Sequence, residues 1–294
     1  MKKQTTLVVA LALLFIVIQY LLRIPYYQYL LGPTFRLQGN IQNVLDVFCI
    51  IAYLIVDLIT VVSGALALSH SDVIQKEKAY VWFRYMFVVI SLFSLVFDLY
   101  YFYLSGRYIF HNLFHGIVRI VLFPGQIALV VFLIRNKPER AVQRVNLQHY
   151  DMVTYTPKSQ RFVHYLLDFI FIIPVWLNII LVFVNMGLYG HNQVLLELGA
   201  EVMIGIAFIF YYFISEAIFS QTFGKMVTKS CVVTNGVEFT GGRMFIRSLC
   251  RLIPFDKFSF LFGANWHDRA SSTAVVYVDS WEKAFDDKPN SEQA

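Results

Sequence analysis

Six long apolar stretches constrain this chain more strongly than any other feature of its sequence. A bilayer core about 30 Å thick is crossed by roughly 20 residues of apolar α-helix. The stretches that meet this length are residues 6–22, 44–68, 80–104, 112–134, 162–187 and 198–220. Among 294 residues, 58% are hydrophobic and only 15% are charged, which leaves no soluble domain of useful size. The sequence therefore predicts an all-α integral membrane protein with about six transmembrane helices.

Basic residues are distributed unevenly around these stretches. Lys2 and Lys3 precede the first, the segment 136–160 after the fourth is basic, and further Lys and Arg follow Ser220. Because basic loops are retained on the cytoplasmic side of a membrane, we expect both termini in the cytoplasm. The net charge of +5 does not indicate a nucleic-acid partner, since no basic stripe with base-reading or stacking groups accompanies it.

The polar segment 136–160 also predicts how the chain is organised. It contains Pro138 and Pro157 and separates the first four apolar stretches from the last two. No internal repeat relates the two membrane regions, so a duplicated transporter architecture is not indicated. The expected parts are an N-terminal four-helix membrane region at 1–135, a cytoplasmic basic linker at 136–160, a membrane domain at 161–279 and a polar C-terminal tail at 280–294.

Ionisable residues inside the apolar stretches need partners, because each costs roughly 2.5 to 3.5 kcal/mol near the bilayer centre. Asp98 and Arg119 lie at similar depths, about two turns from the outer ends of the third and fourth stretches, and are expected to form an ion pair. Such a pair serves either helix packing or a functional site. Asp57 has no obvious partner in the sequence, so it is expected either to be protonated or to face a polar cavity.

A second group of ionisable residues occurs in the fifth and sixth stretches. Arg161 and Asp168 are seven residues apart, about two helical turns, and therefore share one helix face. Glu216 lies at a depth in the sixth stretch similar to that of Asp168 in the fifth. If these acids meet, they share a proton or a cation, because like charges in a low dielectric cannot both ionise without compensation. We expect these residues to form a polar membrane site.

Polar motifs follow one another in a fixed order between about residues 160 and 278. They are RFVHYLLD with Arg161 and Asp168, QTFGK after Glu216 with Thr222, Gly224 and Lys225, RSLCRLIPFDKFSFL with Arg247 and Arg251, and WHDRASSTAVV with Asp268. Their order and spacing resemble those of the RDD family of bacterial multi-pass membrane proteins. The resemblance implies a bacterial inner-membrane domain with clustered polar residues. Sodium–proton exchange has been proposed for some family members, and interaction or assembly roles for others.

The chain departs from the family pattern between residues 243 and 261, where a further hydrophobic span is expected. This segment contains basic residues, a proline and an aspartate, and so is a poor candidate for a span. Arg243, Arg247 and Arg251 recur every four residues, with apolar side chains at other angles. The pattern predicts an interfacial amphipathic helix lying flat on the inner membrane surface. A re-entrant course for residues 243–261 remains the alternative.

Short β-type runs surround this amphipathic segment. Asn235-Gly236 stands between CVVT and VEF, which is a strong sequence signal for a hairpin with a two-residue turn. Residues 273–278 would add a third strand, because an isolated hairpin is marginally stable in water. The sequence therefore predicts a small cytoplasmic β element after the last span.

The HDR triplet before residues 273–278 is interpreted as a latch. Asp268 is expected to accept hydrogen bonds from Arg247 or Arg251 and to hold the tail against the mouth of the Asp168/Glu216 site. The alternative is that Asp268 only caps a turn or a short helix. No set of ligands accompanies His267, so we expect no metal site.

The motifs exclude common enzyme classes and leave two functions open. No nucleotide-binding, hydrolase or metalloprotease motif occurs, so we expect no enzyme activity and no cofactor. The first function is transport, in which Asp168 and Glu216 bind a monovalent cation or a proton for exchange, or a small solute is carried. The second is a non-transporting membrane adaptor or assembly factor, whose basic face binds anionic lipid and which contacts a protein partner or forms a homo-oligomer.

Overall fold

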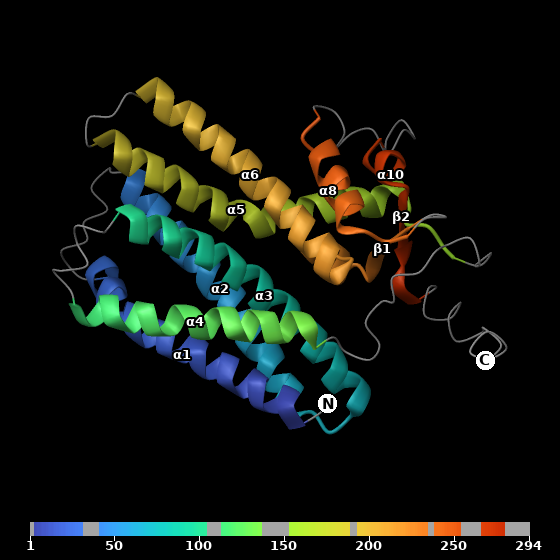
Figure 1. The fold of residues 1–294 in the computed structure, drawn as a ribbon, viewed down its shortest axis with the longest axis horizontal. Coiled ribbons are helices and arrows are strands. Elements are labelled where there is room, and N and C mark those ends of the chain that lie inside the picture. Colours follow the sequence, from blue (N-terminus) through green and yellow to red (C-terminus); the bar gives the residue numbers. More distant parts are fainter. Residues whose placement is uncertain are drawn as a thin grey trace. The chain divides into compact units, whose positions relative to one another are not determined.

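A computed structural model describes residues 3–31, 41–104, 113–136, 153–188, 193–234, 238–253 and 266–279 of the chain. The chain divides into two compact units, Met1–Ala141 and Val142–Ala294. In Figure 1 the first unit is coloured from blue to green, and the second from yellow-green to red. The boundary between the units falls inside the polar segment 136–160.

The first unit is a bundle of long helices. It consists of α1 (Lys3–Leu31), α2 (Ile41–Ser69), α3 (Val73–Leu104) and α4 (Leu113–Arg135). Along the described residues α1 contacts α2, α2 contacts α3, α3 contacts α4 and α4 contacts α1, so the helices close into a ring. Aromatic side chains fill the interior: Phe83 stacks on Phe87, and Phe15 packs edge-on against Phe87.

A buried arginine joins two helices of this bundle. Arg84 of α3 donates to the carbonyl oxygens of Leu133 and Ile134, at 2.5 Å from Nε and 3.1 Å from Nη2. These carbonyls belong to the last turn of α4, where the helix has no internal N–H donors left for them. A cation at this end also complements the negative end of the helix dipole, so Arg84 fixes α3 against the end of α4.

The second unit combines two long helices with shorter elements. These are α5 (Lys158–Leu188), α6 (Gln193–Phe219), α7 (Phe223–Val227), β1 (Ser230–Thr234), α8 (Gly241–Cys250), α10 (Trp266–Ser271) and β2 (Thr273–Tyr277). Within this unit α5 and α6 lie side by side, and α8, α10 and both strands gather at one end of the pair (Figure 1). The chain can therefore bring residues from distant parts of the sequence together at that end.

Helices α1 to α6 overlap the predicted apolar stretches; most are longer than predicted, whereas α4 is shifted by one residue. Within the described residues, four segments are long and apolar enough to cross a membrane: Ile51–Ser69, Val73–Leu95, Lys158–Leu177 and Leu198–Phe219. The described parts of α1 and α4 contain shorter apolar segments, Gln4–Gln19 and Leu122–Arg135. The mainly helical membrane class follows from these lengths and compositions.

The β element differs from the predicted hairpin. β1 pairs antiparallel with β2, with Cys231 opposite Val276 and Val233 opposite Ala274, whereas residues 238–240 are not in a strand. These four side chains form a buried apolar cluster. In the neighbouring VEF segment Glu238 is exposed, whereas nearly all of the distant run TAVVY is buried. Pairing β1 with TAVVY therefore buries more apolar surface than pairing it with VEF would. The predicted Asn235-Gly236 turn lies outside the described residues.

The strand pairing can be tested by a cross-strand disulfide. Val232 lies opposite Val275, but its N–H bonds to Ser220 and the Val275 carbonyl accepts from Thr156, so the two valines do not hydrogen-bond to each other. Such non-hydrogen-bonded pairs bring side chains closest across a sheet. In a chain whose native cysteines are replaced by alanine, we expect Val232→Cys with Val275→Cys to oxidise to a disulfide, measured by gel mobility. Val232→Cys with Phe239→Cys, the pair expected from a local hairpin, should stay reduced; the reverse pattern would refute the β1–β2 pairing.

Candidate functional site

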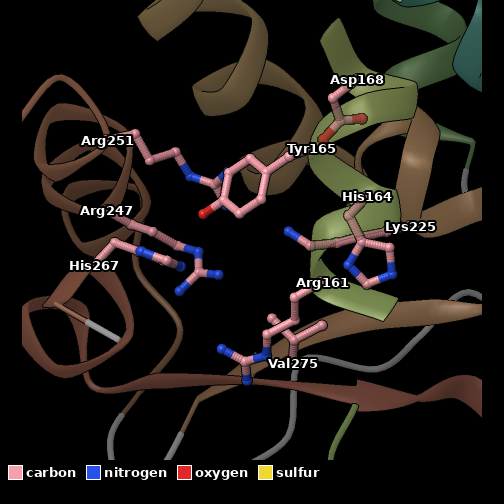
Figure 2. A pocket seen from close by; sticks show the side chains of 9 residues that line it. All are labelled: Arg161, His164, Tyr165, Asp168, Lys225, Arg247, Arg251, His267 and Val275. Atoms are coloured by element: carbon pink, nitrogen blue, oxygen red, sulfur yellow. The ribbon is translucent and has the colours of Figure 1, made fainter. Parts of the chain in front are cut away.

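A small cavity lies in the second unit where α5, α7, α8, α10 and β2 come together (Figure 2). About 20 Å³ of it is open to the centre of a water molecule. The charged side chains that line it are Arg161, Asp168, Lys225, Arg247 and Arg251. Taking charges out of water costs several kcal/mol per ion after relaxation, so a buried group of this kind must be compensated by close partners. These partners define the candidate site.

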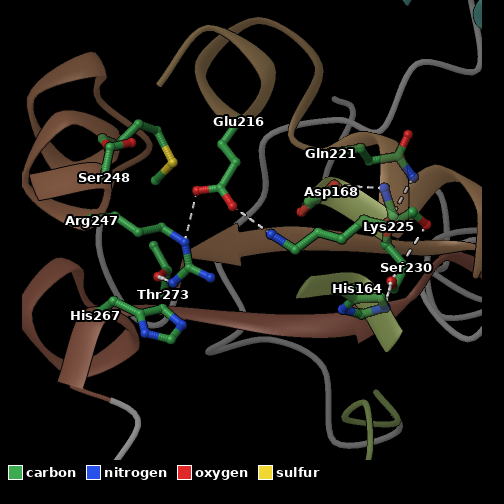
Figure 3. A network of polar contacts seen from close by, with 12 residues as sticks. His164, Asp168, Glu216, Gln221, Lys225, Ser230, Arg247, Ser248, His267 and Thr273 are labelled. Atoms are coloured by element: carbon green, nitrogen blue, oxygen red, sulfur yellow. Dashed lines mark hydrogen bonds and ion pairs between the residues drawn. The ribbon is translucent and has the colours of Figure 1, made fainter. Parts of the chain in front are cut away.

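Glu216 is the first centre of the compensating ion pairs (Figure 3). It lies in the last turn of α6 and is completely buried. Its Oε1 accepts from Lys225 Nζ at 2.5 Å and from Arg251 Nη2 at 2.7 Å, and its Oε2 accepts from Arg247 Nε at 2.9 Å. Both oxygens of Glu216 are therefore occupied by cationic donors, and the end of α6 is tied to α7 and α8.

Asp268 is the second centre. Its Oδ1 accepts from Arg247 Nη1, and its Oδ2 accepts from Arg161 Nη1 at 2.5 Å. Burial alone would raise the pKa of Asp268, but Arg247, His267 and Arg161 outweigh it and hold this pKa well below its usual range. Arg247 also donates to the Thr273 hydroxyl at 2.6 Å. It therefore bridges both carboxylate centres and connects α8 to α10 and to the start of β2.

Arg247 of α8 and Arg251 at its end face the protein interior, which corrects the prediction that they lie along the membrane surface, whereas Arg243 is half-buried. Met244, Arg247 and Ser248 are buried, and Arg251 at the end of the helix is 4% exposed. Their spacing of three and four residues places them on one helix face. The apolar residues on the remaining faces are 39–46% exposed: Phe245, Ile246, Leu249, Leu252 and Ile253. The helix is amphipathic as predicted, but its cationic face is the packed one.

Aromatic rings complete the surroundings of Arg251. Its guanidinium carbon lies 3.9 Å from the centroid of the Tyr212 ring and 5.7 Å from that of Tyr165. Such contacts place a cation against the negative face of an aromatic ring and gain strength where water is excluded. Arg251 was expected to be an alternative partner of Asp268, but the structure pairs it with Glu216 between rings from α5 and α6.

Asp168 has its own set of partners, so the prediction that it shares a proton with Glu216 is wrong for this structure. Its Oδ1 accepts from the backbone N–H of Gly224 at 2.7 Å and from the Tyr211 hydroxyl at 2.9 Å. These donors are neutral, whereas Glu216 is surrounded by cations. Arg161, expected to act on both acids, instead pairs with Asp268. The carboxylates are compensated separately because each has donors within reach.

Gly224 is required by a close approach between α7 and α5. A Cβ at this position would lie 2.5 Å from the carbonyl oxygen of His164 and 2.9 Å from its Cα. Backbone atoms cannot move away as a side-chain end can, so only glycine lets the Gly224 N–H reach Asp168. The glycine of the QTFGK motif thus has a definite structural reason.

Lys225 is the main site residue to which sequence reasoning assigned no role. It follows Gly224 in α7 and its side chain is 4% exposed. Burial lowers its pKa, Glu216 opposes this, and Arg251 and Arg247 lower it further, to about 8. The ion pair with Glu216 favours the charged form of Lys225 against the effect of burial. A lone basic residue just after the apolar sixth stretch was the available signal, but its nine-residue distance from Glu216 does not correspond to a shared helix face.

The remaining candidates from the sequence belong to the first unit. Asp57 is half-buried in α2 and takes part in a polar or electrostatic contact, so the prediction that it is unpartnered is wrong. Asp98 and Arg119 belong to α3 and α4, but their side chains lie outside the described part of the chain. Among the described residues, no group of three or more His, Cys, Asp or Glu side chains is arranged to hold a metal ion.

Comparison with protein families accounts for the second unit. Residues 155–277 match the family model of the RDD family. The chain contains an RDD family domain. This RDD domain includes every element from α5 to β2 and all residues of the ion-pair cluster, by which we mean Arg161, Glu216, Lys225, Arg247, Arg251 and Asp268. No curated protein and no solved structure matches the chain in these comparisons. The RDD domain and the apolar helices together identify the chain as a membrane protein.

The cluster predicts a large effect of neutralising its central acid. Glu216→Gln removes the negative charge and leaves buried cations without full compensation, which costs about 3 to 5 kcal/mol in comparable buried pairs. We expect a clearly lower apparent melting temperature of the purified protein in detergent. The matched control is Glu201→Gln, an exposed residue on the same helix, which should leave the melting temperature unchanged. Equal behaviour of the two variants would contradict the structural importance of the cluster.

The close approach at Gly224 generates a second prediction. Gly224→Ala should destabilise the domain by about 1 to 3 kcal/mol or more, because the new methyl group overlaps backbone atoms of His164. Gly205→Ala is the control, since a Cβ there meets nothing within 4 Å. Thermal unfolding followed by circular dichroism distinguishes the two. A Gly224→Ala protein as stable as Gly205→Ala would mean that α7 does not pack against α5 at this distance.

Proposed function

We propose that this protein is a non-enzymatic, non-transporting membrane adaptor or assembly factor of a bacterial inner membrane, with both termini in the cytoplasm. In this proposal the ion-pair cluster stabilises the RDD domain by holding its helices together and does not bind a transported ion. The observation that supports it is the coordination of Glu216, whose two oxygens accept from Lys225, Arg247 and Arg251. One of the two acids of the expected cation site is thus already compensated by the protein's own cations.

Electrostatics favours the adaptor over exchange at Glu216. A sodium ion entering this position would have to displace buried cations or lie beside them. At an effective dielectric constant of about 20, two like unit charges 4 Å apart repel by roughly 4 kcal/mol. Displacing Lys225, Arg247 or Arg251 would in turn leave a buried cation without a partner. Cation binding to Glu216 is therefore costly by either route.

The outward face of α8 is the surface proposed to contact a partner. Because Arg247 and Arg251 point inward, the ten-residue helix leaves large apolar side chains uncovered in the described structure, among them Phe245, Ile246 and Leu249. The predicted binding of anionic lipid through these arginines is not supported, since Arg247 and Arg251 are consumed by ion pairs. We assign the apolar face to a partner membrane protein, with a second copy of this chain as the alternative occupant.

One observation keeps exchange as the second candidate. Asp168 is 2% exposed, and among the described residues no Lys, Arg or His lies within ion-pair distance of its carboxylate. Its hydrogen-bond donors are Gly224 and Tyr211, which carry no charge. An intramembrane acid of this kind is able to bind a proton or a sodium ion. Exchange, if it occurs, should therefore depend on Asp168 and not on Glu216.

Proteoliposome assays separate these candidates. For the adaptor we expect sodium or proton flux under an imposed gradient to equal that of empty vesicles, because the cluster offers no free cation site. Flux above that background which disappears in Asp168→Asn, but survives in the exposed-residue variant Glu201→Gln, would overturn the adaptor proposal in favour of exchange.

The partner surface is tested in intact cells with a photo-reactive amino acid. Placed at Phe245 on the apolar face of α8, it should give a discrete protein adduct, because this side chain is 45% exposed. Placed at Arg269, an exposed position on α10, it should not. An adduct of twice the chain's mass would identify a second copy as the partner. Adducts to lipid alone at Phe245 would contradict an adaptor function for this face.

A further inference from the structure

Two arginines that line the cavity carry buried hydrogen-bond donors without an acceptor among the described residues. Arg247 Nη2 and Arg251 Nε are both buried and have no acceptor among the described residues. Arg247 donates through Nε and Nη1 to Glu216, Asp268 and Thr273, and Arg251 donates through Nη2 to Glu216, so these bonds orient the two guanidinium groups. A buried N–H without an acceptor costs about 1 to 3 kcal/mol, more for a charged group. Two of them on one cavity indicate a missing acceptor.

The charges around the cavity also indicate that an acceptor is missing there. Among the described residues, the cations Arg161, Lys225, Arg247 and Arg251 are accompanied by the carboxylates of Asp168, Glu216 and Asp268. Counted as ionised, these four cations and three carboxylates leave an excess of one positive charge. An uncompensated buried charge is strongly destabilising, whereas a single bound anion would balance it.

The side chains that line the cavity do not suit a cation, nor a neutral ligand that both donates and accepts hydrogen bonds. The side chains of four cations reach toward the same interior space in Figure 2: Arg161, Lys225, Arg247 and Arg251. Asp168 is the carboxylate on this lining, and its Oδ1 already accepts two hydrogen bonds. A ligand here meets several donors and little acceptor capacity. An acceptor that carries negative charge satisfies this environment better than water, which must also donate its own hydrogens.

The size of the cavity restricts the anion. About 20 Å³ of the cavity is open to the centre of a water molecule. One buried water molecule needs about 10 to 15 Å³ of cavity volume. A monatomic halide fits this space and is smaller than a sulfate, a phosphate or a lipid headgroup. The cavity is bounded on one side by Val275 of β2, whose side chain points away from the apolar cluster of Ala274 and Val276.

We propose that the RDD domain of this protein holds one small monovalent anion of the size of chloride in this cavity, between Arg247 Nη2 and Arg251 Nε. The anion completes the charge balance of the ion-pair cluster and bridges the arginines of α8 to Lys225 of α7. Folding of the domain is then linked to halide concentration, because a ligand that binds only the folded state stabilises it. This site goes beyond the adaptor proposal and does not depend on it.

Halide dependence of stability tests the site directly. The full-length protein, purified in detergent without chloride, is titrated with sodium chloride or sodium bromide against sodium gluconate at equal ionic strength. We expect a saturable rise in apparent melting temperature of about 3 °C or more for either halide and none for gluconate. Equal responses to the halides and to gluconate would overturn the proposal, because screening and not binding would then explain the effect.

Two further measurements locate the anion. Val275→Ile adds a methylene group at the cavity and should abolish most of the halide response, whereas Val276→Ile, on the opposite strand face, should keep it. In crystals of the unaltered protein grown with bromide, an anomalous difference peak is expected beside Arg247 and Arg251. Absence of that peak at full bromide concentration would overturn the proposal even if the valine variants failed to fold.

Discussion

The RDD domain depends on the burial of Glu216 at the end of α6 among Lys225, Arg247 and Arg251. A carboxylate at 0% exposure is tolerated only when its charge is compensated, and here the compensation comes from α7 and α8. Arg247 then extends the network to Asp268. Helices that differ widely in sequence position are held in place because none of the buried charges can be left without its partner.

The inverted orientation of α8 follows from this constraint. An amphipathic helix next to a membrane ordinarily keeps its arginines in water or at lipid headgroups. In this domain, acids from α6 and α10 draw Arg247 into the interior, and Tyr212 covers Arg251. The apolar side chains of α8 are left outward as a result. The same ion pairs that lock the domain therefore create the surface proposed for a partner, and the small excess of positive charge creates the proposed anion site.

Several site residues were predictable because they belong to ordered sequence motifs. Arg161, Glu216, Arg247 and Asp268 were all expected to take part in polar contacts, and they do so in the structure. The pair of Arg247 with Asp268 was among the predicted alternatives. The partners of Arg161 and Glu216 were not predicted, since a carboxylate accepts equally well from any nearby cation. Sequence reasoning also assigned no role to Lys225, because its contact with Glu216 forms only where α6 ends and the chain turns back into α7.

By itself the sequence determined the apolar helices, their approximate bounds, the RDD motifs and the amphipathic character of α8, because these depend on composition and on the helical repeat within short segments. Only the tertiary structure decided that β1 pairs with β2 and that Arg247 and Arg251 face inward. It also decided that Asp168 and Glu216 have separate partners. These outcomes depend on which distant groups meet, and the low dielectric of the interior makes that choice energetically decisive.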